Sequence, residues 1–377
     1  MIYLDHAATT RMCPEALEAM RPFLEGSFGN PSAIYTFAGE AKAAIDEVRE
    51  TLAASIGARP DEIFFTSGGT EADNWAIFGT AFANRERGRH IITSQIEHHA
   101  VLHPLARLED LGFTVTYVAP DAEGRISPEA IEEAIRPDTI LVSVMYANNE
   151  VGTTQPVAEI GEICKKHGVL FHTDAVQAYG HVPIDVQRVN IDLLSVSGHK
   201  MGGPKGIGFL YMRKHTNIAS YLLGGAQERQ MRAGTENVPG IVGLGCAASV
   251  AVHHLEREQE RVTALRERMI SRLLEEIPDI RINGSRKDRL PGNVNVTIQG
   301  VSAETLLVLL DLAGICASAG SACAAGSIDP SHVLLAMGLT KEEAKSTIRL
   351  SMGAETTEEE IEKTCDILRD LVQKLRA

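Results

Sequence analysis

A chain of 377 residues is long enough for two or three domains, or for one large enzyme with two lobes. Its hydrophobic residues make up 44 % of the total, which is enough to fill a substantial core. The 36 lysines and arginines are outnumbered by 50 acidic residues, and the resulting net charge of −14 argues against direct binding to nucleic acid.

Neither a membrane segment nor a disulfide framework is expected. The longest apolar stretch, residues 241–252, is too short and too rich in glycine and alanine to span a bilayer. The first residues lack the basic and apolar regions of a signal peptide, and no two cysteines form a Cys-x-x-Cys pair. We therefore expect free thiols in a reducing cytoplasm. The cysteines are Cys13, Cys164, Cys246, Cys316, Cys323 and Cys365.

Short strand-like runs alternate with helical periodicity over the first two thirds of the chain. This alternation indicates an α/β fold with a mostly parallel sheet covered by helices. The predicted strands are residues 63–66, 90–93, 114–118, 140–145, 169–172, 193–197 and 208–212. Helices are predicted between them, for example at residues 40–56, 72–87 and 157–167.

The pattern changes after residue 250. A long charged helix over residues 250–276 is predicted to connect two lobes. Beyond it the pattern indicates a smaller α+β lobe. Its predicted strands are residues 293–298, 315–317 and 347–351, and its predicted helices are residues 303–313 and 357–376.

A glycine-rich turn follows the first predicted strand. Ser67-Gly68-Gly69-Thr70-Glu71 leads into a predicted helix, so its backbone N–H groups and the hydroxyls of Ser67 and Thr70 could bind a phosphate. The same residues also match a helix capping box, Ser/Thr-x-x-Glu, and the two interpretations are compatible.

An aspartate lies just beyond the predicted strand 169–172. Asp174 is at the carboxyl end of that strand, where open α/β sheets bind their ligands. Pyridoxal phosphate needs such a carboxylate, because an aspartate paired with the pyridine nitrogen keeps the nitrogen protonated and makes the ring an electron sink.

A lysine leaves the predicted strand 193–197 in the segment Ser197-Gly198-His199-Lys200. Glycines follow it, so the lysine is held stiffly and partly desolvated, as a Schiff-base lysine must be to keep its amine neutral. The alternative is an ordinary solvated lysine on a surface loop. Lys200 lies 26 residues after Asp174 (200 − 174), which leaves room for a strand–helix–strand crossover.

With these three motifs in this order, the chain resembles the cysteine desulfurases of the NifS/IscS type, in the class V aminotransferase branch of fold type I pyridoxal-phosphate enzymes. The resemblance runs from residue 3 to about residue 351. Further segments that carry it are Tyr3-Leu4-Asp5-His6-Ala7-Ala8-Thr9-Thr10, Phe28-Gly29-Asn30-Pro31-Ser32, Glu97-His98, Asn148-Asn149-Glu150-Val151-Gly152, Arg232-Ala233-Gly234-Thr235 and Ser321-Ala322-Cys323.

The resemblance implies a fold type I architecture. We expect a large pyridoxal-phosphate domain over residues 15–255 and a small C-terminal domain over residues 256–377. Residues 1–14 are expected to pack on the small domain.

The resemblance also implies a cofactor site. Lys200 would bind pyridoxal phosphate as a Schiff base, Asp174 would pair with its ring nitrogen, and Gln177 would reach its phenolic oxygen. His98 would lie on the ring face, where an imidazole can move protons. The implied cofactor-binding set also contains Gly69, Thr70, Asn149, Ser197, His199 and Thr235.

Two further roles follow from the resemblance. Thr235 would reach the phosphate in the neighbouring subunit, which implies a homodimer with shared sites. Asn149 and Arg349 would bind the substrate carboxylate, for which a guanidinium offers a bidentate fork. The alternative for Arg349 is a surface salt bridge of little energetic value.

No metal is expected. His99 and His103 have the i, i+4 spacing that can bind zinc on a helix, but no third ligand lies near them in the sequence. A core histidine is another alternative to the catalytic interpretation of His98.

Cys323 determines the expected reaction. It lies among small residues over 317–327, a composition that predicts a mobile loop. A thiol there could collect sulfur and pass it to a partner, whereas a buried, inert thiol is the alternative, and Cys316 fits that alternative better. The resemblance implies that L-cysteine is converted to L-alanine while Cys323 becomes a persulfide, with Lys200 and His98 also catalytic.

Two residues depart from the family pattern. His6 stands where asparagine or tyrosine is common, and Ala324 stands where threonine or serine is common. They leave the sulfur acceptor open among an iron–sulfur scaffold, a tRNA-thiolation protein and a cofactor-biosynthesis protein. The alternatives for the whole chain are a selenocysteine lyase, another class V aminotransferase or lyase, or a non-enzymatic scaffold in a sulfur-transfer complex.

Overall fold

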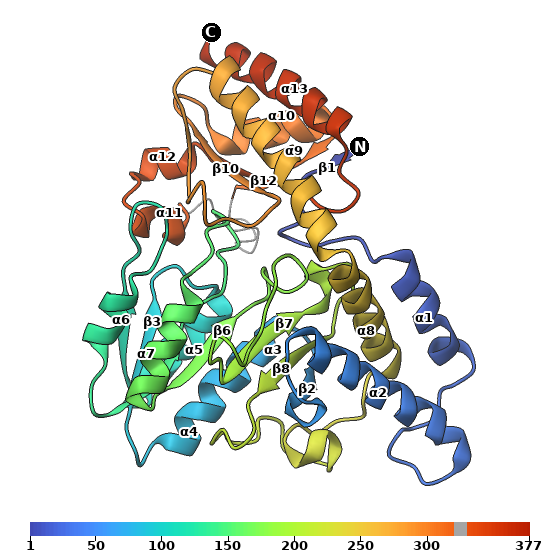
Figure 1. The fold of residues 1–377 in the computed structure, drawn as a ribbon. Helices are drawn as coiled ribbons and strands as arrows, with labels where there is room; N and C mark the ends of the chain where they lie inside the picture. Colours follow the sequence, from blue (N-terminus) through green and yellow to red (C-terminus); the bar gives the residue numbers. More distant parts are fainter. Residues whose placement is uncertain (320–329) are drawn as a thin grey trace.

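The computed structural model describes residues 1–319 and 330–377, which form two lobes (Figure 1). Within these ranges, seven strands form the sheet of the larger lobe, in the order β2-β8-β7-β6-β5-β3-β4. β8 runs antiparallel to both neighbours and the other neighbouring pairs are parallel, which confirms the predicted mostly parallel sheet. The strands are β2 (Ile63–Thr66), β3 (His90–Ser94), β4 (Thr114–Val118), β5 (Thr139–Ser143), β6 (Leu170–Asp174), β7 (Leu193–Ser197) and β8 (Gly208–Met212).

Helices flank this sheet, and most of its strands are therefore buried along their whole length. The apolar runs that predicted the strands reflect this burial on both faces. The helices of the larger lobe are α1 (Pro14–Glu25), α2 (Thr36–Ser55), α3 (Gly69–Asn74), α4 (Thr80–Asn84), α5 (His99–Asp110), α6 (Pro128–Ala134), α7 (Val157–His167) and α8 (Val238–His253).

The continuous helix predicted over residues 72–87 is wrong in one respect. A π-helical turn, Trp75–Gly79, separates α3 from α4. The buried indole of Trp75 donates its N–H to the carbonyl oxygen of Ala219 at 3.0 Å. This contact joins segments far apart in the sequence, so the local helical pattern did not indicate it.

The smaller lobe has its own sheet and its own core. β9 (Ile280–Ile282), β10 (Asn293–Ile298) and β12 (Thr347–Ser351) form an antiparallel sheet, with β10 in the middle. β1 (Ile2–Tyr3) runs parallel to β11 (Ile315–Cys316) and brings the N-terminus to this lobe. The helices here are α9 (Leu255–Glu276), α10 (Ala303–Leu312), α11 (His332–Ala336), α12 (Lys341–Lys345) and α13 (Glu358–Arg376).

The single connecting helix predicted over residues 250–276 is also wrong. The chain forms two helices, α8 and α9, which meet at His254 with a bend of 72°. α8 is apolar and packs against α1 and α2, whereas α9 packs one face against α13 and exposes a charged face. In the described residues, no single helix is both long and apolar enough to cross a membrane.

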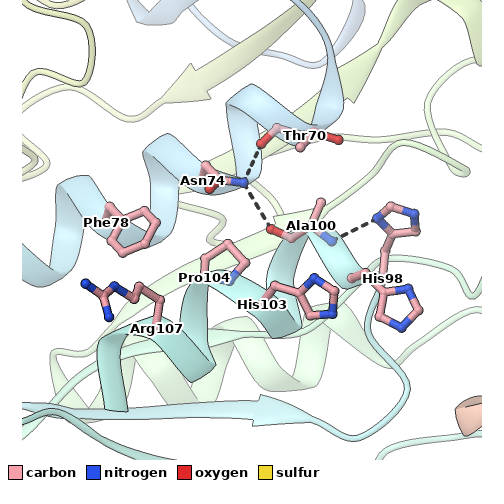
Figure 2. A pocket seen from close by; sticks show the side chains of 9 residues that line it. Thr70, Asn74, Phe78, His98, Ala100, His103, Pro104 and Arg107 are labelled. Atoms are coloured by element: carbon pink, nitrogen blue, oxygen red, sulfur yellow. Dashed lines mark hydrogen bonds between the residues drawn. The ribbon is translucent and has the colours of Figure 1, made fainter. Parts of the chain in front are cut away.

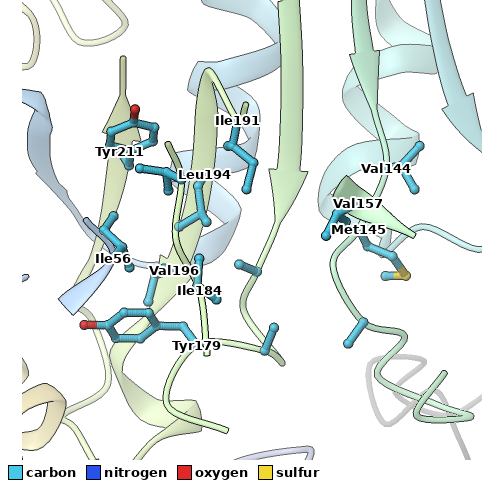
Figure 3. Packing of buried hydrophobic residues seen from close by; sticks show 14 of the residues in the cluster. Ile56, Val144, Met145, Val157, Tyr179, Ile184, Ile191, Leu194, Val196 and Tyr211 are labelled. Carbon is cyan, nitrogen blue, oxygen red and sulfur yellow. The ribbon is translucent and has the colours of Figure 1, made fainter. Parts of the chain in front are cut away.

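The core of the larger lobe lies against the central strands (Figure 3). Leu194 and Val196 of β7 and Tyr211 of β8 contribute to it, together with Ile56 at the end of α2. β7 carries the segment that begins at Ser197, so the packing of the core fixes where that segment starts.

A core substitution should therefore be costly. Leu194 is fully buried, so Leu194→Ala should lower the free energy of unfolding by about 2–5 kcal/mol through lost contacts and a residual cavity. Leu312→Ala is the matched control, because Leu312 is 78 % exposed and its truncation should cost no more than about 0.5 kcal/mol. Denaturant titration of both variants measures the difference, and equal costs would contradict this description of the core.

Candidate active site

A cavity of about 380 Å³ opens at the carboxyl ends of the parallel strands, with walls from both lobes. Its position is the one expected for a ligand site in an open α/β sheet. Most of the predicted site residues line it, namely Gly69, Thr70, His98, Asn149, Asp174, Gln177, Ser197, His199, Lys200 and Arg349. The exposed Thr235 is not among its lining residues, and Cys323 lies outside the described residues.

The turn before α3 forms one wall. Gly68 has φ +146°, which favours glycine, and a Cβ on Gly69 would come within 2.6 Å of the side chain of Val176. Glu71 accepts a hydrogen bond from the backbone N–H of Ser67 at 2.8 Å, but no side chain caps the helix at Gly68. The capping box is therefore not formed, because Ser67 lies four residues before Glu71 where the motif needs three. The backbone of this turn packs closely against the cavity.

Asp174 is the last residue of β6 and is buried at the cavity wall. One carboxylate oxygen, Oδ1, accepts the backbone N–H of Val176 at 2.8 Å. Burial raises the pKa of Asp174 to about 6, while the hydrogen bond from Val176 and the charge of Lys200 oppose that rise.

Lys200 ends the 3₁₀ turn Gly198–Lys200 that follows β7. Its Nζ donates to the carbonyl oxygens of Ala7 at 2.6 Å and Ala8 at 2.7 Å. Gln177, in a turn after β6, donates to the same carbonyl of Ala7 at 2.9 Å. The N-terminal segment therefore positions the lysine, a role that the strand-end argument did not reveal.

His98 caps the N-terminus of α5 (Figure 2). Its Nδ1 accepts the backbone N–H of Ala100 at 3.1 Å, so the remaining proton of the neutral ring is on Nε2. Burial and then the charge of Lys200 lower the pKa of His98 to about 4, which keeps the imidazole uncharged near neutral pH. His98 thus offers a fixed proton donor at the cavity wall.

Figure 2 also shows how α3 and α5 are held together beside His98. The side-chain amide of Asn74 donates to the carbonyl oxygens of Thr70 and Ala100. A groove of about 420 Å³ lies along these two helices and shares Thr70, His98 and His99 with the lining of the cavity.

Arg349 on β12 is only 2 % exposed, so the surface salt bridge considered for it is wrong. Its guanidinium donates to the carbonyl oxygen of Asn149 and to the carboxylate of Asp5, each at 2.9 Å. Its Nε has no hydrogen-bond partner among the described residues. A buried guanidinium facing a cavity is well suited to bind a carboxylate.

Two histidines lie close to His99, which lines both the cavity and the groove. The rings of His103 and His332 each lie with centroids 4.9 Å from that of His99. Within residues 1–319 and 330–377, no three metal-ligating side chains are arranged to hold an ion.

Two buried acids beside the cavity were not predicted to have a role. Asp73 on α3 is 1 % exposed and lines the cavity. Glu97 is fully buried, accepts the backbone N–H of Met145 at 3.0 Å, and has its pKa raised by burial to about 8. Asp73 lies four residues after Gly69, on the same helix face, and this spacing could have indicated it.

The family described as aminotransferase class-V matches residues 2–364 of the chain. A curated cysteine desulfurase IscS from Methanosarcina thermophila is 54 % identical, over 100 % of this chain and 93 % of that protein. A putative cysteine desulfurase IscS 1 from Bacillus subtilis is 52 % identical over 99 % of both.

Solved structures agree in fold. A NifS-like protein superposes with a TM-score of 0.93 at 38 % identity, over 99 % of both chains. SspA in complex with cysteine gives a TM-score of 0.84 at 42 % identity, over 93 % of this chain and 99 % of that one. These likenesses confirm the predicted fold class.

The neutral state of His98 can be tested by NMR. The pKa of His98 falls from 6.5 in the unfolded chain to about 4 in the folded protein. Its contribution to the free energy of unfolding is therefore complete above pH 6.5 and is lost as the pH falls through 4. Side-chain titration should therefore find His98 uncharged well below pH 6.5, with the histidines of the denatured protein titrating near 6.5 as the control. A midpoint near 6.5 in the folded protein would contradict the assignment.

Proposed function

The chain belongs to the class-V aminotransferase family, and on this premise we propose that it works as a cysteine desulfurase that leaves the sulfur of L-cysteine on Cys323 as a persulfide and releases L-alanine. The observation that carries the proposal is the convergence of Lys200, Asp174 and Arg349 on one cavity. A lysine, a buried carboxylate and a buried guanidinium are the groups that a pyridoxal-phosphate enzyme needs for an amino-acid substrate.

Class-V aminotransferases are pyridoxal-phosphate enzymes, and the residues of the cavity fit that cofactor. A volume of about 380 Å³ is in the usual range for a ligand of this size. Asp174 is a buried carboxylate that would hold the ring nitrogen, and Lys200 would provide the amine. The bound cofactor supplies an electron sink for negative charge that develops at the substrate Cα. We assign its phosphate to the turn at Gly69 and Thr70, with Ser197 and His199, and to Thr235 of the neighbouring subunit.

The remaining chemistry comes from side chains of the chain. Arg349 and Asn149 would hold the substrate carboxylate, and Lys200 would take the proton from Cα once its amine is free. His98, with its proton on Nε2, would donate and recover a proton at the reacting atoms. In the sulfur transfer, the thiolate of Cys323 attacks the substrate sulfur and the carbon–sulfur bond breaks. Its electron pair leaves with the three-carbon fragment, which takes up a proton and is released as alanine, so no external oxidant is required.

Cys323 itself lies outside the described residues, but both flanks of its segment are attached next to the cavity. Ser318 pairs with Arg349 through its backbone, N to O at 3.1 Å. Ser331 donates its hydroxyl to the buried carboxylate of Glu150, which lines the cavity. These attachments support the assignment of Cys323 to this site.

We further propose that the enzyme is a homodimer and that it passes its sulfur to an acceptor protein in a reducing cytoplasm. Thr235 is exposed and does not line the cavity of its own chain, which leaves it available to the cavity of a second subunit. The five described cysteines, Cys13, Cys164, Cys246, Cys316 and Cys365, are free.

Arg349→Lys tests the carboxylate site. A lysine keeps the charge but loses the bidentate fork, so we expect KM for L-cysteine to rise about tenfold or more with a smaller change in kcat. Arg281→Lys is the control, because Arg281 is in the same lobe but pairs with Glu343 at the surface. Steady-state kinetics measure both constants, and an unchanged KM would show that Arg349 does not bind the substrate carboxylate.

Cys323→Ser tests the sulfur acceptor. The variant should bind the cofactor and L-cysteine normally, because neither step uses the thiol, whereas alanine formation should fall to background. A serine hydroxyl stays protonated near neutral pH and does not replace a thiolate. Cys316→Ser is the control and should remain active. Undiminished release of alanine by Cys323→Ser would overturn this role.

A further inference from the structure

Asp174 is not the only aspartate in the wall of the cavity. Asp73, on α3, is 1 % exposed, and Asp174, at the end of β6, is 6 % exposed. The two side chains are close enough for the charge of Asp174 to raise the pKa of Asp73. Two carboxyl groups therefore share one buried environment, while the proposed reaction uses only Asp174.

The surroundings of the two carboxyl groups differ. Asp174 accepts a backbone N–H from Val176 and interacts with the charge of Lys200, and both favour its ionised form. Oδ1 of Asp73 is buried and has no hydrogen-bond partner among the described residues. Glu97 adds further negative charge near Asp73 whenever it ionises, and it also interacts with Asp174.

The nearest basic group does not compensate Asp73. His172 Nε2 lies 3.6 Å from Asp73 Oδ1, but His172 is completely buried and its pKa is lowered by burial to about 3. Its two ring nitrogens are already bonded, to the hydroxyls of Ser143 at 2.8 Å and Ser195 at 3.0 Å. His172 is therefore a neutral ring held by neutral neighbours.

Two like charges in one buried site cannot both persist without a counter-ion, and the proton goes to the group with the weaker stabilisation. Burial first, and then the charge of Asp174, raise the pKa of Asp73 well above its ordinary value. Ser195 opposes this rise only in part. Geometry and electrostatics both place the proton on Asp73.

We propose that Asp73 is a positioning residue that stays uncharged, so that the pair of aspartates carries a single negative charge and that charge is fixed on Asp174. The role of Asp73 rests on the proposed function, whereas its protonation state does not. A single negative charge on the two aspartates matches the single positive charge of the protonated ring nitrogen of pyridoxal phosphate. A second carboxylate would also favour the ammonium form of Lys200, which faces the same cavity and has to act as a base.

Infrared spectroscopy of the full-length holoenzyme tests the protonation directly. With the side-chain carboxyl carbons of aspartate labelled with ¹³C, the spectrum near neutral pH should contain a carboxylic-acid carbonyl band that shifts on labelling. This band should be absent from Asp73→Asn. Glu97 carries no label, so a band from its acid form does not move.

Two further variants make the assignment specific. Asp192→Asn should keep the band, because Asp192 is half-buried beside the sheet and is paired with Arg213 and the backbone N–H of Phe171. Asp174→Asn should keep it as well, and it serves as the test if Asp73→Asn does not fold. A band that is missing from the wild type, that persists in Asp73→Asn, or that disappears in Asp174→Asn would overturn the proposal.

The pH dependence of unfolding provides a second readout. A carboxyl group whose pKa is raised in the fold contributes stability below its unfolded pKa, near 4, and loses it as the pH rises toward the folded pKa. Relative to Asp73→Asn, the unfolding equilibrium constant of the wild type should therefore rise about tenfold per pH unit over that window. A ratio that does not vary with pH would contradict the proposal. Neither measurement needs turnover. If the protonation of Asp73 is refuted, the proposed function is unaffected. If the proposed function is refuted, the protonation state of Asp73 can still be measured.

Discussion

The charge distribution in the cavity depends on one constraint, a negative charge placed on Asp174 at the buried end of β6. A carboxylate in a low-dielectric site is costly unless hydrogen bonds and an opposite charge compensate it. Asp174 receives a backbone N–H from Val176 and the charge of Lys200. The two histidines of this region, His172 and His98, add no charge, because burial lowers their pKa and keeps both rings uncharged near neutral pH. The cavity thus concentrates its charge on a few groups that face the ligand.

The N-terminal segment connects this charge to the second lobe. β1 pairs with β11, Asp5 binds Arg349, and the carbonyl oxygens of Ala7 and Ala8 accept hydrogen bonds from Lys200. One short segment therefore contacts the lysine of one lobe and the arginine of the other. A shift of this segment would move both groups, so the relative position of the two lobes and the geometry of the cavity are coupled.

Much of this arrangement could be predicted from the sequence, and the exceptions have a common physical origin. Strands such as β7 and β12 are buried on both faces, so their apolar runs marked both ends correctly. The residues that line the cavity lie at the end of β7, just after it, and within β12. The bend at His254 and the π-helical turn at Trp75 depend on packing between distant segments, which local periodicity does not encode. Local periodicity does not indicate the role of Asp73 either, because that role depends on Asp174, which is close in the fold but distant in the sequence. The domain boundaries and the roles of the individual site residues remain predictions.

The covalent attachment of pyridoxal phosphate is the most direct test of the central claim, that the end of β7 carries the reactive amine. The purified protein would be reconstituted with the cofactor, reduced with borohydride, digested and mapped by mass spectrometry. A single modified lysine, Lys200, is expected, with no adduct in Lys200→Ala. An adduct on another lysine, or a protein that does not retain the cofactor at all, would contradict it.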